Sequence, residues 1–111
     1  MAEELQEPPT DVDDQPAELD WKGFRLDEMG GQQVGKIAGT IVDEASRPWL
    51  LARMGRFGHY CLVPARDAVS ANERVWVPYT REHIRRAPRV RPGDLPEGED
   101  LEVILAHYGS V

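Results

Sequence analysis

Hydrophobic positions fall into short segments that alternate with polar residues and are separated by glycine- and proline-containing turns. The clearest stretch predicts a hairpin, with one strand over residues 49–54 and the next over residues 60–63. Between them, residues 55–58 contain two glycines, which can adopt the positive φ angles that a tight chain reversal needs. Pro64 ends the second strand because it has no amide hydrogen for strand pairing.

Three further segments predict strands. Residues 23–26 alternate and form a first strand, and residues 35–43 form a second one, in which Gly39 indicates a bulge or a tight bend. Residues 74–77 alternate again and form the last strand. Short strands with a turn at about every ten residues favour a small, mostly antiparallel β-barrel of about five or six strands. Closure would also remove the exposed edges of the sheet.

Helical signals follow the last strand. Thr80 is a predicted N-cap for a short helix over residues 81–87, and Pro88 ends it because proline disfavours helical geometry in the preceding residue. Residues 99–108 have the spacing of a last helix, with one narrow apolar stripe made of Leu101, Leu105 and Tyr108.

Charge divides the chain of 111 residues and net charge −7 into three parts. Residues 1–20 hold eight acidic residues and no basic one, and residues 92–111 hold five acidic residues and no basic one. All thirteen basic residues lie in residues 21–91, together with seven acidic ones. We expect a disordered acidic segment over residues 1–20, since it has too little apolar surface to offset the entropy of ordering. One barrel domain then spans residues 21–91, with an acidic extension over 92–111. The acidic ends either shield the basic middle or only keep the protein soluble.

The cysteine count and the distribution of apolar residues predict the cellular compartment. Cys61 is the one cysteine, so no internal disulfide can form, and this suits a reducing cytoplasm. The first residues have no apolar region typical of a signal peptide, and no apolar stretch approaches the length of a membrane span. We therefore expect a cytoplasmic protein, and leave open whether it dimerises to support its small core.

Several short motifs keep a fixed order along residues 22–90. They are Phe24-Arg25-Leu26, Gly31-x-x-Val34-Gly35-Lys36-Ile37, Val42-Asp43, Trp49-Leu50, Gly55-Arg56-Phe57-Gly58, Val63-Pro64, Val75-Trp76-Val77-Pro78 and Ala87-Pro88. Together they resemble the PRC-barrel domain, a small β-barrel found in the photosynthetic reaction-centre H subunit and at the C-terminus of a bacterial ribosome-maturation factor. The order is most similar to small stand-alone members from high-GC bacteria, which often end in a helix with a His-Tyr-Gly motif, here His107-Tyr108-Gly109.

The resemblance implies a function without catalysis. The family shares no catalytic residue and no obligatory cofactor, so we predict no enzyme activity, no catalytic or metal residues and no cofactor. It implies an adaptor that docks a cytoplasmic protein partner. Two alternatives are an RNA-associated role in ribosome maturation or RNA metabolism, and an accessory structural role in a photosynthetic or electron-transfer complex.

The predicted partner-binding residues are Trp76, Arg81, Arg85 and Arg86. Two valines flank Trp76 and share a face, so the indole points the other way, toward solvent or a partner. Arg81 and Arg85 stand four residues apart and share a helix face. Aromatic side chains near arginines are typical of interface hot spots. The alternatives are that the tryptophan packs in the core and that the arginines form a solvated helix face.

Other constellations carry weaker signals. The segment 30–37 is similar to a phosphate-binding loop, but it lacks the hydroxyl residue after the lysine, and we predict a turn. His59, Cys61 and His83 are too few for a closed zinc site, and we predict a buried thiol with surface imidazoles.

Overall fold

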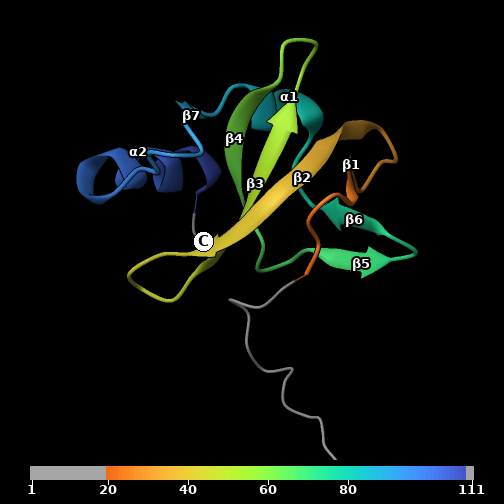
Figure 1. Cartoon of the computed structure of the whole chain (residues 1–111), viewed down its shortest axis with the longest axis horizontal. Coiled ribbons are helices and arrows are strands. Elements are labelled where there is room, and N and C mark those ends of the chain that lie inside the picture. Colours follow the sequence, from red (N-terminus) through yellow and green to blue (C-terminus); the bar gives the residue numbers. More distant parts are fainter. Residues whose placement is uncertain (1–19, 110–111) are drawn as a thin grey trace, which may run out of the picture.

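The structure is a computed structural model that describes residues 20–109, so the predicted disordered segment over residues 1–20 lies, except for Asp20, outside the described residues. The described part is mostly β, as predicted, with a short helix after the sixth strand and a longer one at the end (Figure 1). The strands are β1 (Arg25–Glu28), β2 (Gln33–Val42), β3 (Pro48–Met54), β4 (His59–Pro64), β5 (Val69–Ala71), β6 (Arg74–Val77) and β7 (Arg89–Val90). The helices are α1 (Arg81–Arg85) and α2 (Gly98–Tyr108).

All of these strands belong to one sheet with the order β5-β6-β1-β2-β3-β4-β7. The pairs are antiparallel except for β1 and β6, which run parallel. The mostly antiparallel pairing is confirmed, but the predicted closed barrel of five or six strands is wrong, because the sheet is open and has seven strands. Its two outermost strands explain the opening. β5 has three residues, all exposed, and β7 has two, so neither offers a ladder long enough to join the edges.

The inner face of the curved sheet holds the main core. On β6, Val75 and Val77 are completely buried, and Leu26 of β1 and Ile37 of β2 lie beside them in the core. Ile84, the one buried residue of α1, belongs to the same cluster. Period-two alternation along β6 thus directs its valines inward, as predicted.

β3 is buried on both faces, since Trp49, Leu50, Leu51 and Ala52 are all buried in succession. A strand reads as a continuous apolar run when both faces of the sheet are covered. The outer face, defined here as the side of β3 that carries Trp49 and Leu51, is covered by α2 at its Trp49 end. The Trp49 ring meets the Tyr108 ring of α2 edge to face, with ring centroids 6.4 Å apart.

Two glycines shape the pairing of β2 with β3. The register shifts between Ile37 and Gly39, which confirms the predicted bulge. At Gly35 the strands approach so closely that a Cβ atom would overlap the carbonyl oxygen of Arg53. Only glycine fits there without moving the neighbouring backbone.

The predicted hairpin, the strand predicted over residues 74–77 and both helices are confirmed, with ends that differ by at most two residues from the predicted ones. The Thr80 hydroxyl accepts a hydrogen bond from the His83 amide at 3.1 Å, which confirms the N-cap. The prediction missed β5 and β7: it placed no strand between residues 63 and 74 or after residue 77, but residues 69–71 pair with β6 and residues 89–90 pair with β4. No helix within the described range 20–109 is both long enough and apolar enough to cross a bilayer.

Candidate functional site

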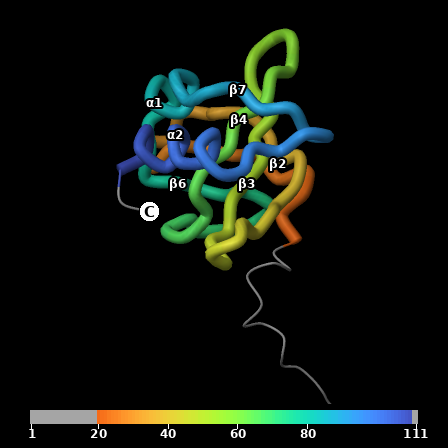
Figure 2. Tube along the Cα trace, turned by 90° about the vertical axis from the view of Figure 1, so that its left-hand side faces the viewer, coloured from red at the N-terminus to blue at the C-terminus, as the bar shows by residue number. Residues whose placement is uncertain are grey.

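Two histidines fix the position of α2 against α1. The Nε2 atom of His83 lies 2.9 Å from the carbonyl oxygen of His107, and the Nε2 atom of His107 lies 2.6 Å from the carbonyl oxygen of His83. A carbonyl can only accept, so both Nε2 atoms carry the hydrogen. The two rings also stack, with centroids 4.2 Å apart and 14° between their planes. This reciprocal pair joins the two helices side by side, as Figure 2 shows.

Tyr108 completes the junction. Its ring meets those of Tyr79, His83 and His107 edge to face at centroid distances of 4.9, 5.5 and 5.1 Å. Burial, with smaller contributions from Cys61 and Tyr79, raises the pKa of the Tyr108 phenol, so the group stays neutral. The residues of the predicted His-Tyr-Gly motif therefore hold α2 in place over the outer face.

Asp43 organises the loop between β2 and β3. One carboxylate oxygen accepts hydrogen bonds from the Ala45 amide at 2.8 Å and the Arg47 amide at 2.9 Å. The other accepts from Arg47 Nε at 2.7 Å and Trp49 Nε1 at 2.9 Å. Burial alone would raise the pKa of Asp43, but the bonds from Trp49, Arg47 and Ala45 lower it to about 2. The carboxylate is therefore ionised and fully engaged at neutral pH, which suits a structural role better than proton transfer.

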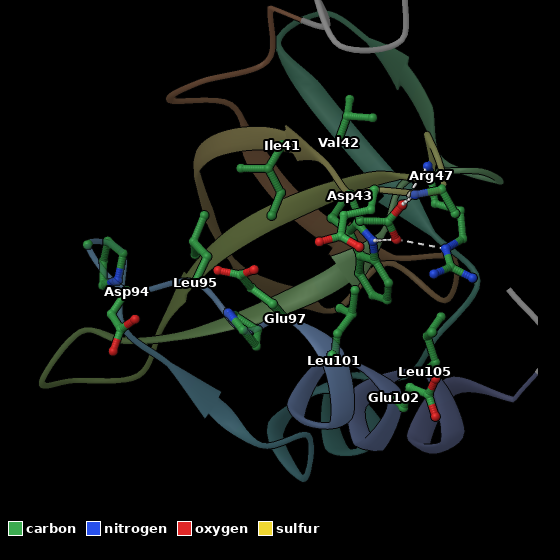
Figure 3. Close-up of a pocket in the computed structure, with 17 residues that line it drawn as sticks. Ile41, Val42, Asp43, Arg47, Asp94, Leu95, Glu97, Leu101, Glu102 and Leu105 are labelled. Atoms are coloured by element: carbon green, nitrogen blue, oxygen red, sulfur yellow. Dashed lines mark hydrogen bonds and ion pairs between the residues drawn. The ribbon is translucent and has the colours of Figure 1, made fainter.

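A groove with a volume of about 800 Å³ runs between this loop, α2 and the segment that precedes α2 (Figure 3). Its floor is apolar, and Leu101 and Leu105 point from α2 toward the β2–β3 loop, opposite Ile41 and Leu95. The carboxylates that line it are Asp43, Glu44, Asp94, Glu97 and Glu102, and the one cation among the lining residues is Arg47.

We call this the acidic groove, because the carboxylates that line it outnumber the cations. Arg47 is bound to Asp43 at 2.7 Å, so these two charges cancel, and four carboxylates remain. Glu44, Asp94, Glu97 and Glu102 are all exposed at its rim. An apolar floor with a negative rim suits a ligand that is both apolar and positively charged. Leu101 and Leu105 of the stripe predicted on α2 form one wall. The polar residues 43–48 predict a loop, but no sequence signal indicated that this loop faces α2.

The four predicted partner-binding residues lie on two elements. Trp76 of β6 is half-buried and faces away from the core, in register with Asp27 of β1 and Val69 of β5. Arg85 and Arg86 are exposed on or directly after α1, and both bind Glu82, at 2.6 and 3.1 Å.

Arg81 begins α1, one turn before Arg85. Its backbone amide donates to the Glu28 carboxylate at 2.6 Å, and the residue lines a separate cleft with Lys36 and Arg53. Arg85 and Arg86 are not among the residues that line this cleft. The prediction that the four residues contact a partner stays a prediction.

His59, Cys61 and His83 do not come together. Cys61 is completely buried with its sulfur 4.0 Å from the Ala87 carbonyl oxygen, and burial raises the pKa of its thiol. His83 is engaged with α2, as described above. Burial, then the charges of Arg89 and Arg85, lower the pKa of His59 below its usual value of 6.5. Within the described residues 20–109, no group of three or more histidine, cysteine, aspartate or glutamate side chains has the arrangement of a metal site.

Comparison with known proteins leaves the family open: no protein-family model matches this chain, and no curated protein matches it either.

Proposed function

We propose that this chain is a non-enzymatic interaction module, related to PRC-barrel domains, that docks a protein partner in the acidic groove. The composition of the groove carries the proposal. Leu101, Leu105 and Ile41 offer an apolar surface in a concave setting, and Glu97 and Glu102 border it with exposed negative charge. A basic, amphipathic segment of a partner matches both properties, because its apolar side chains would fill the floor while its lysines or arginines meet the rim.

The architecture supports this proposal in a second way. The groove is bordered by elements that are themselves fixed: Asp43 binds four donors in the loop, and the His83–His107 pair holds α2. A preformed surface binds with a smaller entropic cost than one that must be ordered on contact. The acidic rim also favours fast association with a positively charged partner.

Affinity capture from the native cytoplasm tests the proposal. The double variant Glu97→Lys with Glu102→Lys reverses rim charge at two exposed positions, and we expect it to reduce the capture of specific partners several-fold. The control Asp67→Lys with Glu99→Lys makes the same change in net charge at exposed positions outside the groove and should leave capture intact. Equal capture by wild type and the groove variant, measured by quantitative mass spectrometry, would refute the groove as the docking surface.

The predicted surface around Trp76 is tested in the same experiment. The double variant Trp76→Ala with Arg85→Glu removes an outward aromatic ring and reverses a charge on α1. Loss of capture with this variant, together with full capture by the groove variant, would assign the partner to the Trp76 surface. If neither variant changes capture and no protein is enriched over empty resin, protein docking itself is refuted.

A further inference from the structure

A row of basic side chains crosses the outer face at the end of the sheet opposite the acidic groove. The strand register places Arg74 of β6 beside Arg25 of β1, Arg25 beside Lys36 of β2, and Lys36 beside Arg53 of β3. Residues in register point to the same face of a sheet, and here all four are exposed or half-exposed. Since neighbouring strands are about 4.8 Å apart, this basic row spans about 14 Å.

Beside the row lies a cleft of about 500 Å³. Lys36, Arg53 and Arg81 line it together with two glutamines, Gln32 and Gln33, and no carboxylate is among its lining residues. The backbone of Arg81 is held at the cleft, because its amide donates a hydrogen bond to the Glu28 carboxylate at 2.6 Å.

These cations are poorly compensated inside the molecule. Arg25 binds Asp27 at 2.7 Å, but Lys36, Arg53, Arg74 and Arg81 form no ion pair with any residue in the range 20–109. Like charges directly opposite each other on neighbouring strands are destabilising. A ligand that brings several negative charges in sequence would therefore gain from the whole row.

An aromatic side chain projects next to the cleft. Phe57 is 93% exposed at the tip of the β3–β4 hairpin, which extends beyond the sheet in Figure 1. The turn is well defined: Gly55 and Gly58 have φ of 78° and 69°, and a Cβ atom at Gly58 would lie within 2.9 Å of the Arg53 guanidinium. Gly55 itself lines the cleft, so the exposed ring stands two residues away from the cationic surface.

We propose that the basic row, with Arg81 and Phe57, is a binding site for single-stranded nucleic acid. Phosphates would follow the row, and an unstacked base would lie on the Phe57 ring, which is the combination that sequence-tolerant single-strand binding requires. An anionic membrane fits less well, because a single apolar side chain at the tip gives little insertion energy. An acidic protein surface would pair with the basic row, but it would offer no planar base to stack on the Phe57 ring. The inference does not depend on the acidic groove.

The salt dependence and the variants separate these occupants. Fluorescence anisotropy of a labelled oligouridylate with the full chain, at low salt, should show saturable binding. If four phosphates are neutralised, the slope of log K against log salt concentration should be about −3. The double variant Lys36→Glu with Arg74→Glu should weaken binding at least about tenfold. In this double variant, both new carboxylates lie directly opposite Arg25, an arrangement that stabilises a pair of strands. A loss of binding would therefore report on the basic row and not on a loss of folding.

A control and a second readout keep the test sharp. Arg66→Glu with Arg91→Glu makes the same change in net charge at exposed positions outside the row, and its affinity should stay within about threefold of wild type. Phe57→Ala should weaken binding about 5- to 100-fold without changing the salt slope, since stacking releases no counterions. The proposal is overturned if the control loses as much affinity as the row variant. It is also overturned if duplex RNA or vesicles of anionic phospholipid bind while the oligouridylate does not.

Discussion

Replacing Asp43 by asparagine would test how the β2–β3 loop is held. The side chain of Asp43 is 5% exposed and binds four donors through both oxygens. Its pKa falls from 3.8 to about 2, and one pKa unit corresponds to about 1.4 kcal/mol, so the folded state favours the charged form by about 2 kcal/mol. Asp43→Asn removes this charge and points an amide NH₂ group at a donor. We expect a loss of about 2–3 kcal/mol in the free energy of unfolding at neutral pH.

Urea denaturation at several pH values measures this effect. Because the pKa of Asp43 is lowered in the folded state, its stabilisation is complete above about pH 4 and is lost as the pH falls toward about 2. The difference between wild type and Asp43→Asn should therefore shrink by about 1 kcal/mol between about pH 7 and pH 3. Glu44→Gln, in the same loop but exposed, serves as the control and should change stability little. A constant difference across this pH range would refute the assignment of the energy to the carboxylate charge.

Three further predictions concern the close approach of β2 and β3 at Gly35, the attachment of α2 through His107 and the imidazole of His59. Gly35→Ala should destabilise the protein by about 2–3 kcal/mol because its Cβ meets backbone, whereas Gly39→Ala, with open space around it, should cost less than about 1 kcal/mol in the same thermal or urea unfolding experiment. His107→Ala removes one hydrogen bond and a stacked ring from the junction of the helices. We expect the free energy of unfolding to fall by about 1–3 kcal/mol and the amide-exchange protection of α2 to decrease. Val103 is 57% exposed on the same helix, so the control Val103→Ala should alter neither quantity. The pKa of His59 is lowered by burial and by two nearby arginines, so His59 takes up a proton at a higher pH in the unfolded chain than in the folded one, and the free energy of unfolding falls as the pH drops below 6.5. His59→Gln should reduce this fall in stability between about pH 7.5 and pH 5.5 in urea denaturation. An unchanged dependence of stability on pH would contradict the prediction.

Local sequence signals were sufficient for most elements. Thr80 before a short helical segment and Pro88 after it predicted α1, and alternation predicted β6 with its buried valines. Short pairings and closure were harder to predict. β5 consists of three exposed residues, none of which joins the core, and it becomes a strand only through hydrogen bonds to β6. Whether a sheet closes depends on the length of its edge strands, which hydrophobic patterning does not encode.

The candidate surfaces depended more strongly on tertiary arrangement. The outward direction of Trp76 followed from alternation alone. The basic row could not be foreseen, because it requires β6 to pair in parallel with β1 and requires the bulge at Gly39, which decides the residue of β3 that faces Lys36. On α2, the stripe omitted Ile104, which is completely buried and completes the helical spacing from Leu101 to Tyr108.

The position of α2 has a consequence for the order in which the protein forms during synthesis. The segment that shields Trp49 is the last one of the described chain to leave the ribosome. Its anchor is the pairing of His83 with His107, two residues that are synthesised at different times. Until that helix emerges, a nascent chain with all its strands complete still exposes the Trp49 ring on one side of β3. A stalled or prematurely released product would therefore be prone to aggregation or to capture by chaperones. The eleven-residue α2 removes this risk when it packs over the exposed apolar surface.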